Sequence, residues 1–127
     1  DTAVVTLKFA NGAMGVIDNS RRAVYGYDQR VEVFGSEGAV MDVNDTPTNA
    51  VYYGADGSVA SPCYKIMWDR YTGAFAAEQQ AFAEAVLNGT EPLVTGEDGL
   101  YPILIAAAAT KSLKEGRPVK LSEIEAI

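Results

Sequence analysis

Apolar and polar residues alternate over most of the first sixty positions, a pattern typical of β-strands. The alternation is clearest over residues 3–9, and Asn11-Gly12 follows it. This pair is typical of a type I′ hairpin turn, in which both central residues have positive φ. The predicted strands cover residues 3–9, 13–21, 31–34, 39–43, 51–53 and 59–60. Because turn residues separate them, we expect a mostly antiparallel sheet of five or six strands.

Beyond residue 62 the apolar period changes to that of an α-helix. One stripe of the predicted helix consists of Tyr71, Phe75, Glu78, Phe82 and Val86. Apart from the glutamate, these side chains are expected to pack onto one face of the sheet. Asn88-Gly89 is a typical left-handed helix cap, so we expect the helix to end there.

A second helix is predicted between Thr95 and Gly116. The threonine hydroxyl and the acidic residues that follow it suit the exposed N–H groups of a helix N-terminus, and the glycine is a typical stop signal. Pro102 deletes one hydrogen bond inside this segment, so the helix either starts later than Thr95 or bends. Residues 117–121 predict a last short edge strand.

Strands followed by helices predict an α+β domain with two helices packed on one face of the sheet. The other face is then open for assembly. Val4, Met14 and Val16 are expected to meet a partner chain or another domain there, although Thr6 and Lys8 also fit a solvated face. The chain begins without an initiator methionine, directly before a strand, so we expect it to be a piece of a longer protein.

Composition excludes several classes of function. The 127 residues are 48% hydrophobic, which fits one globular domain, and the net charge of −7 argues against binding nucleic acid or anionic membranes. No histidine is present, and Cys63 is the single cysteine, so histidine-based nucleophile systems, an internal disulfide and cysteine zinc clusters are excluded. We expect no metal site, and we interpret the oxygen-rich residues 42–45 as a solvated turn.

The richest concentration of polar groups lies over residues 18–30, between two predicted strands. Hydroxyl, amide and guanidinium groups together are what recognition of a polyhydroxylated ligand requires. A second concentration lies over residues 68–71, at the start of the first predicted helix. From the residues alone, an aromatic packing edge with salt bridges is the favoured alternative for both.

The sequence also resembles a known family over essentially its whole length. The resemblance is carried by Asp1–Leu7, Phe9, Asn11–Ala13, Gly15, Ile17–Arg21, Ala23–Ser36, Arg70-Tyr71 and Arg117–Val119. These segments are similar to the C-terminal domain of inositol dehydrogenases, in the glucose–fructose oxidoreductase/inositol dehydrogenase/rhizopine-catabolism family. The similarity is dense up to residue 38 and diffuse over residues 43–67.

The resemblance implies that residues 1–127 form the substrate and oligomerisation domain of a two-domain, NAD-dependent polyol dehydrogenase. An N-terminal Rossmann domain would bind NAD and, together with upstream catalytic residues, oxidise a ring carbinol of myo-inositol or a related sugar to a ketone. The chain alone is therefore expected to hold no catalytic residue, to bind no cofactor and to be inactive. The resemblance further implies a homo-oligomer, either a dimer or a tetramer. A cytoplasmic location is predicted from the lone thiol and from the lack of a targeting segment in this sequence. The alternatives are a stand-alone sugar-binding module and a structural dimerisation module.

Carried over by position, the resemblance implies five substrate-side residues. Tyr25 is the first candidate and Tyr71 the second, because their phenol groups would hydrogen-bond the hydroxyls of a cyclitol or sugar. Tyr27, Asp28 and Arg30 follow as contacts or as residues that brace the loop.

Overall fold

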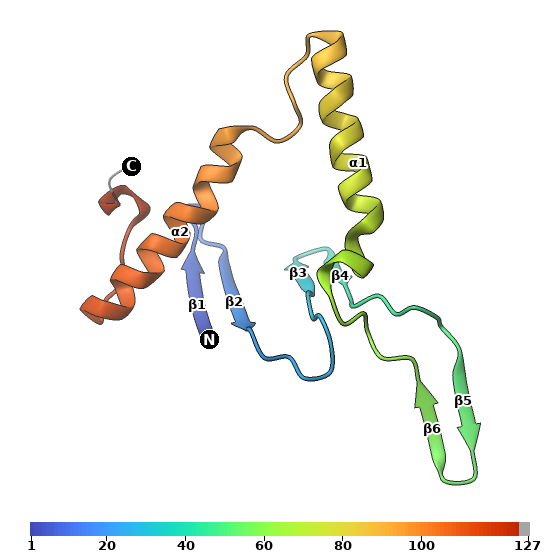
Figure 1. The fold of residues 1–127 in the computed structure, drawn as a ribbon. Coiled ribbons are helices and arrows are strands. Elements are labelled where there is room, and N and C mark those ends of the chain that lie inside the picture. The colour runs from blue at the N-terminus through green and yellow to red at the C-terminus, as the bar shows by residue number, and fades with distance from the viewer. Residues whose placement is uncertain (125–127) are drawn as a thin grey trace. The chain divides into compact units, whose positions relative to one another are not determined.

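The computed structural model describes residues 1–124 and has an α+β fold, with antiparallel strands preceding two helices (Figure 1). This order confirms the predicted class. The strands form three hairpins: β1 (Thr2–Lys8) with β2 (Met14–Ser20), β3 (Val31–Gly35) with β4 (Gly38–Asp42), and β5 (Val51–Gly54) with β6 (Gly57–Ala60). The helices are α1 (Met67–Asn88) and α2 (Gly96–Glu115), followed by a 3₁₀ turn, η1 (Leu121–Glu123).

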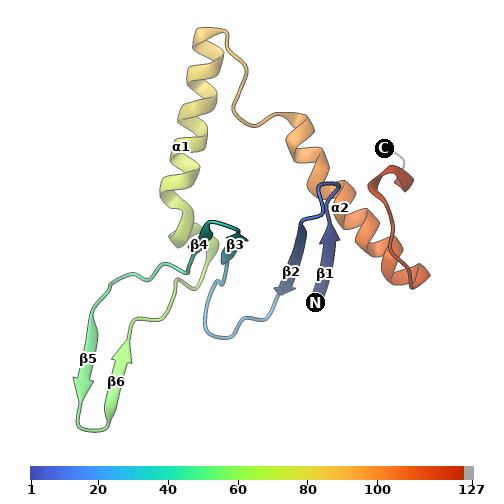
Figure 2. The same cartoon turned by 180° about the vertical axis from the view of Figure 1, so that it is seen from behind.

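Each hairpin is a two-stranded sheet of its own, so the expected sheet of five or six strands is wrong (Figure 2). Strand pairing is antiparallel within each hairpin, where a short turn delivers the two partners to one another. Polar connections over residues 21–30 and 43–50 separate the hairpins along the chain. An alternating pattern says which residues share a face, but it does not specify which hairpin edges pair.

The turn between β1 and β2 is longer than the predicted two-residue turn. Phe9 and Ala13 close a three-residue loop, in which only Gly12 has a positive φ, of +89°. The predicted type I′ turn is therefore wrong, because Asn11 stays at negative φ and accepts a hydrogen bond from the Ala13 N–H instead. A type I turn followed by a left-handed glycine is the usual form of such a loop.

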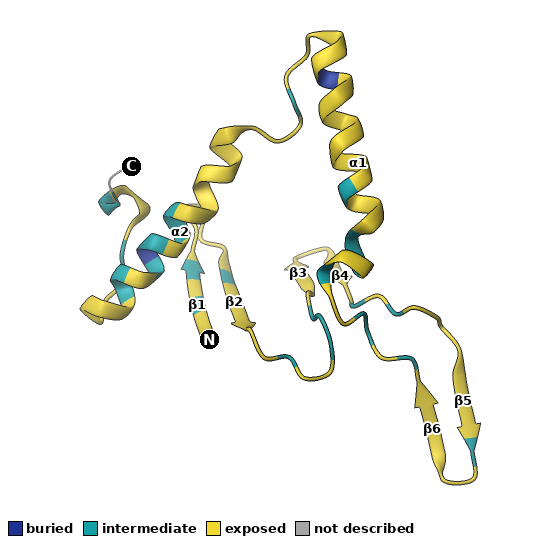
Figure 3. Ribbon diagram, in the orientation of Figure 1, coloured by how far each residue is buried: buried dark blue, intermediate teal, exposed yellow. Residues whose placement is uncertain are grey.

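Very few side chains are buried among residues 1–124 (Figure 3). Only Ala85 and Ala108 reach the buried class, one in each helix. Within its own unit, the second part of the predicted helical stripe leaves Phe82 and Val86 exposed, and the packing of this stripe onto a sheet stays a prediction. Helical spacing identifies one face of a helix but not what covers it.

The chain divides into two compact units, residues 1–75 and 76–127. The first contains the three hairpins and the start of α1. In this part of α1 the backbone departs from helical geometry at Tyr71, with φ −111° and ψ 19°. The break falls one residue after Arg70, and both side chains take part in the polar network described below.

The second unit confirms most of the predicted helix ends. Helix α1 ends at Asn88, followed by Gly89 at φ +62°, and α2 ends before Gly116 at φ +64°. Thr95 and Asp98 form a reciprocal capping box at the start of α2. Helix α2 therefore starts directly after Thr95, and it continues through Pro102.

The predicted edge strand over residues 117–121 is wrong. Glu123 accepts hydrogen bonds from the Arg117 guanidinium at 2.7 Å and from the Lys120 N–H at 2.9 Å. These contacts turn the chain into η1 rather than leaving it extended. Within residues 1–124, neither helix has the length and apolar character needed to cross a membrane.

Candidate functional site

The connection between β2 and β3 carries a hydrogen-bond network centred on one carboxylate. Tyr25 donates its hydroxyl proton to Asp28 Oδ2. Arg30 donates from Nε to Asp28 Oδ1 at 2.7 Å and from Nη2 to Oδ2 at 2.8 Å, a bidentate ion pair. The Asp28 side chain is only 13% exposed, so solvent competes little for these bonds. Three of the five predicted site residues therefore meet at one group.

Asn44 connects this carboxylate to a second part of the chain. Its Nδ2 donates to Asp28 Oδ1 at 2.7 Å, while its Oδ1 accepts from the Gln29 N–H at 2.9 Å and from the Arg70 guanidinium. One amide thus serves as donor and acceptor at once. The interpretation of residues 42–45 as a solvated turn is wrong for Asn44.

Two residues at the start of α1 hold the segment between β2 and β3 through Gln29. Arg70 donates from Nη2 to the Gln29 carbonyl at 2.8 Å, and the Tyr71 hydroxyl donates to Gln29 Oε1, also at 2.8 Å. The rings of Tyr27 and Tyr71 meet edge-to-face, with centroids 6.0 Å apart. The remaining predicted residues, Tyr27 and Tyr71, thereby join the same network through Gln29.

Gly26 allows the connection to pass close to the segment before α1. Its φ is +144°, in a region that residues with side chains rarely adopt. A Cβ here would lie 2.5 Å from Cys63 Sγ and 2.8 Å from the Tyr64 carbonyl oxygen. The adjacent Tyr27 N–H donates to that same carbonyl at 2.7 Å. Glycine is thus required on two counts, by the backbone conformation and by the close approach.

Charge and hydrogen bonding fix the protonation states in the network. Hydrogen bonds from Arg30, and then from Tyr25 and Asn44, hold the pKa of Asp28 well below its ordinary value. The hydrogen bond to Asp28 raises the pKa of Tyr25, because losing the phenol proton would place two negative charges side by side. The carboxylate is therefore ionised and the phenol protonated at neutral pH.

The network borders an open depression of about 1130 Å³ in the first unit. Four of the five predicted residues line it, namely Tyr25, Tyr27, Asp28 and Arg30, whereas Tyr71 does not. Polar residues of β2 and β3 complete the lining on their side, among them Asp18 and Glu32. Such a mixture of hydroxyl, carboxylate and guanidinium groups can hydrogen-bond a small ligand that is rich in hydroxyl groups.

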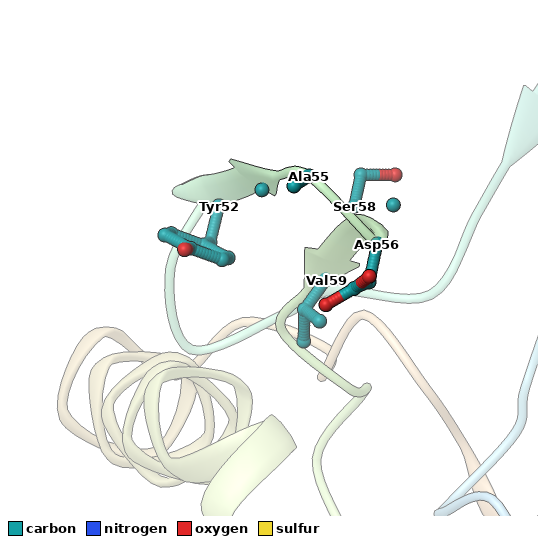
Figure 4. Close-up of a pocket in the computed structure, with 7 residues that line it drawn as sticks. Tyr52, Ala55, Asp56, Ser58 and Val59 are labelled. Carbon is teal, nitrogen blue, oxygen red and sulfur yellow. The ribbon is translucent and has the colours of Figure 1, made fainter.

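A smaller hollow of about 210 Å³ lies at the tip of the β5–β6 hairpin (Figure 4). Tyr52, Asp56 and Ser58 contribute its polar groups, and the turn between the strands completes its lining. The hollow contains none of the predicted site residues. It is a feature of the hairpin turn and takes no part in the polar network.

Asn44 and Arg70 belong to the hydrogen-bond network but are missing from the predicted site. Asn44 lies 16 residues after Asp28 in the sequence, and Arg70 lies 41 residues after Gln29. No local spacing pattern therefore links either residue to the segment between β2 and β3. Arg70 is one of the residues that carry the family resemblance, together with Tyr71, so the sequence holds a signal for it. Asn44 has no comparable signal.

A dinucleotide cofactor does not fit the residues of this chain. Dinucleotides bind where a parallel β-α-β unit places a glycine-rich turn at a helix N-terminus. All strand pairs among residues 1–124 are antiparallel, and the sequence has no Gly-x-Gly-x-x-Gly.

Comparison with known proteins places the chain in a family of enzymes. Residues 1–121 match the family described as "Oxidoreductase family, C-terminal alpha/beta domain". The chain belongs to this family. The match confirms the resemblance on which the site residues were predicted.

The names of individual relatives give more specific activities for those proteins. The chain is 48% identical to a myo-inositol 2-dehydrogenase of Thermotoga maritima over 98% of its own length, and 40% identical to an inositol 2-dehydrogenase of Rhizobium meliloti over 96%. It spans 37% of the length of each of these relatives. The crystal structure of a probable dehydrogenase from Thermotoga maritima matches 98% of the chain and 38% of that protein, with a TM-score of 0.93 and 48% identity.

We predict that Gly26→Ala destabilises the protein more than Gly57→Ala. Both glycines have positive φ, at +144° and +127°, so either alanine incurs backbone strain on the order of 1–3 kcal/mol. Only at position 26 does the new Cβ meet other atoms, since nothing lies within 4 Å at position 57. Denaturant unfolding of both variants measures the difference. Equal losses would show that the close approach at Gly26 does not constrain the fold.

We predict that the stabilising effect of Asp28 is lost in acid. Its pKa is lowered in the folded protein, so its contribution is complete above the unfolded value of about 3.9 and declines as pH falls towards the folded value. The difference in unfolding free energy between the parent protein and Asp28→Asn is therefore largest at neutral pH and shrinks below about pH 4. Unfolding followed at several pH values tests this. A pH-independent difference would contradict the prediction.

Proposed function

We propose that this chain is the substrate-binding domain of an NAD-dependent dehydrogenase that oxidises a ring carbinol of myo-inositol or a related cyclitol to a ketone. The observation that carries the proposal is the polar lining of the depression, where Tyr25, Asp28 and Arg30 lie side by side. The Tyr25 hydroxyl and the Arg30 guanidinium suit a ligand with several hydroxyls, and Asp28 holds both groups in place. The named activities of the inositol dehydrogenase relatives support the choice of substrate class.

In this proposal the cofactor and the reacting groups belong to a separate N-terminal Rossmann domain. NAD would supply the hydride acceptor, and this chain would bind and orient the ring so that its carbinol carbon faces the nicotinamide. The chain alone would then be inactive. The lone thiol Cys63 suits a reducing compartment, and we place the protein in the cytoplasm on that ground.

Within the site, we assign Tyr25 and Tyr71 to the substrate and the others mainly to support. Tyr25 is 56% exposed and lines the depression, which suits a direct contact. Tyr71 lies outside that lining and holds Gln29, so its contribution is expected to be the smaller of the two. Tyr27 packs edge-to-face against Tyr71 and completes the aromatic side of the site.

We predict that Tyr25→Phe lowers kcat/KM for myo-inositol oxidation by the complete protein by about tenfold, since the loss of one hydrogen bond to substrate costs about 1.4 kcal/mol. Tyr71→Phe should have a smaller effect. Tyr25→Phe should also lower the free energy of unfolding by about 1–3 kcal/mol, because Asp28 loses one donor while only 13% exposed, so the kinetics are compared where both proteins are fully folded. Tyr53→Phe is the matched control, on a phenol of β5 that is 79% exposed and lies outside the lining of the depression. Unchanged kinetics in Tyr25→Phe would remove Tyr25 from the substrate site.

We also propose that the chain associates with a second copy through the strands. Opposed residues in β1 and β2 share a face, and one such face carries Val4, Met14 and Val16, which are 67%, 72% and 67% exposed. Adjacent exposed apolar groups of this kind mark association surfaces. This observation favours the second candidate role, that of a dimerisation module, alongside substrate binding.

We predict that Val4→Asp lowers the native mass of the complete protein in light scattering, because burying an unpaired carboxylate opposes association. Val24→Asp is the control, since Val24 is exposed and lies outside the strands. A mass that Val4→Asp leaves unchanged would exclude this face of β1–β2 as the contact.

A further inference from the structure

The two oxygens of Asp28 already accept four hydrogen bonds. Oδ1 accepts from Arg30 Nε and Asn44 Nδ2, both at 2.7 Å, and Oδ2 accepts from Arg30 Nη2 at 2.8 Å and from Tyr25. An ionised carboxylate offers about four acceptor positions. Asp28 therefore has no acceptor position left for a ligand, although it lines the depression. It acts as a positioning residue.

The direction of the hydrogen bond between Tyr25 and Asp28 is unambiguous. A carboxylate that accepts from a guanidinium and an amide holds no proton of its own, so the phenol is the donor. Both pKa shifts favour this direction. The lowered pKa of Asp28 keeps the carboxylate ionised, and the raised pKa of Tyr25 keeps the phenol protonated. Turning the phenol proton towards a ligand would leave the carboxylate one donor short in a place where it is only 13% exposed.

We infer that Tyr25 presents its hydroxyl oxygen, and not its proton, to the ligand, so that the site selects a ring substituent that donates a hydrogen bond. This inference rests on the proposed function and adds a specificity rule to it. A phenol that donates one hydrogen bond retains lone pairs on its oxygen as its only further capacity. Asp28 determines which capacity is used, with Arg30 and Asn44 holding it in place.

This specificity rule distinguishes two ring substituents of similar size, a hydroxyl and a fluorine. A hydroxyl both donates and accepts, whereas a fluorine in its place donates nothing. If Tyr25 accepts, replacing the recognised hydroxyl by fluorine weakens binding as much as removing it, by about tenfold for one hydrogen bond. If Tyr25 donates, the fluorine restores part of the binding that removal of the hydroxyl abolishes.

The experiment uses the complete protein with myo-inositol and its monodeoxy and monodeoxy-monofluoro derivatives, each measured as a competitive inhibitor of myo-inositol oxidation. For the parent protein we expect one ring position at which both replacements weaken binding about tenfold. In Tyr25→Phe that loss should disappear for both, whereas Tyr53→Phe, the control, should retain it. A fluoro derivative that binds better than its deoxy counterpart at that position overturns the inference, and so does a loss that survives in Tyr25→Phe.

A titration without ligand separates this inference from the proposed function. Tyrosine signals in the ligand-free protein, with Tyr25 assigned through Tyr25→Phe, report its pKa directly. We expect a value above the ordinary 10.0, lowered again by Asp28→Asn, which removes the charged acceptor. An unshifted Tyr25 overturns the inference even if the protein oxidises inositol. Absence of inositol oxidation and binding, with the shift present, rejects the proposed function and leaves the hydroxyl orientation supported.

Discussion

The carboxylate of Asp28 is the group on which the candidate site depends. It accepts hydrogen bonds from Tyr25, Arg30 and Asn44 while remaining only 13% exposed. Charge-assisted hydrogen bonds are stronger and shorter than neutral ones, and they replace the water that an ionised group requires. The connection between β2 and β3 has almost no regular secondary structure of its own. Its conformation is held by this network, by the close approach at Gly26 and by Arg70.

The features that the sequence predicted correctly are those determined by neighbouring residues. Helix ends depend on a cap within one turn, so Thr95 and the glycines at positions 89 and 116 were identifiable from their neighbours. The single sheet was predicted wrongly because pairing between hairpins depends on contacts distant in sequence, which alternation does not encode. The prediction of a type I′ turn was wrong for a different reason. Asn11-Gly12 suits more than one loop length, and the closing pair of Phe9 and Ala13 determines which loop forms.

The same division applies to the site. Tyr25, Asp28 and Arg30 are close in sequence, and the family resemblance selected them, whereas their residue types alone favoured a packing edge with salt bridges. The acceptor and donor that complete the network, Asn44 and Arg70, come from the segment after β4 and the start of α1. Arg70 is marked by the resemblance, whereas Asn44 is not. The resemblance therefore predicted which groups could meet a ligand, whereas only the fold shows which groups hold them in place.

This separation bears on how specificity can change in a site of this kind. Asp28 has its acceptor positions filled by the protein, so its role is structural even though it borders the depression. Tyr25 is the opposite case, because its ring is exposed and its proton is already committed. A substitution at the exposed phenol alters what the ligand meets and removes one donor from Asp28, while the hydrogen bonds from Arg30 and Asn44 remain. A substitution at Asp28, Asn44 or Arg70 releases the connection itself and so alters every contact that depends on it.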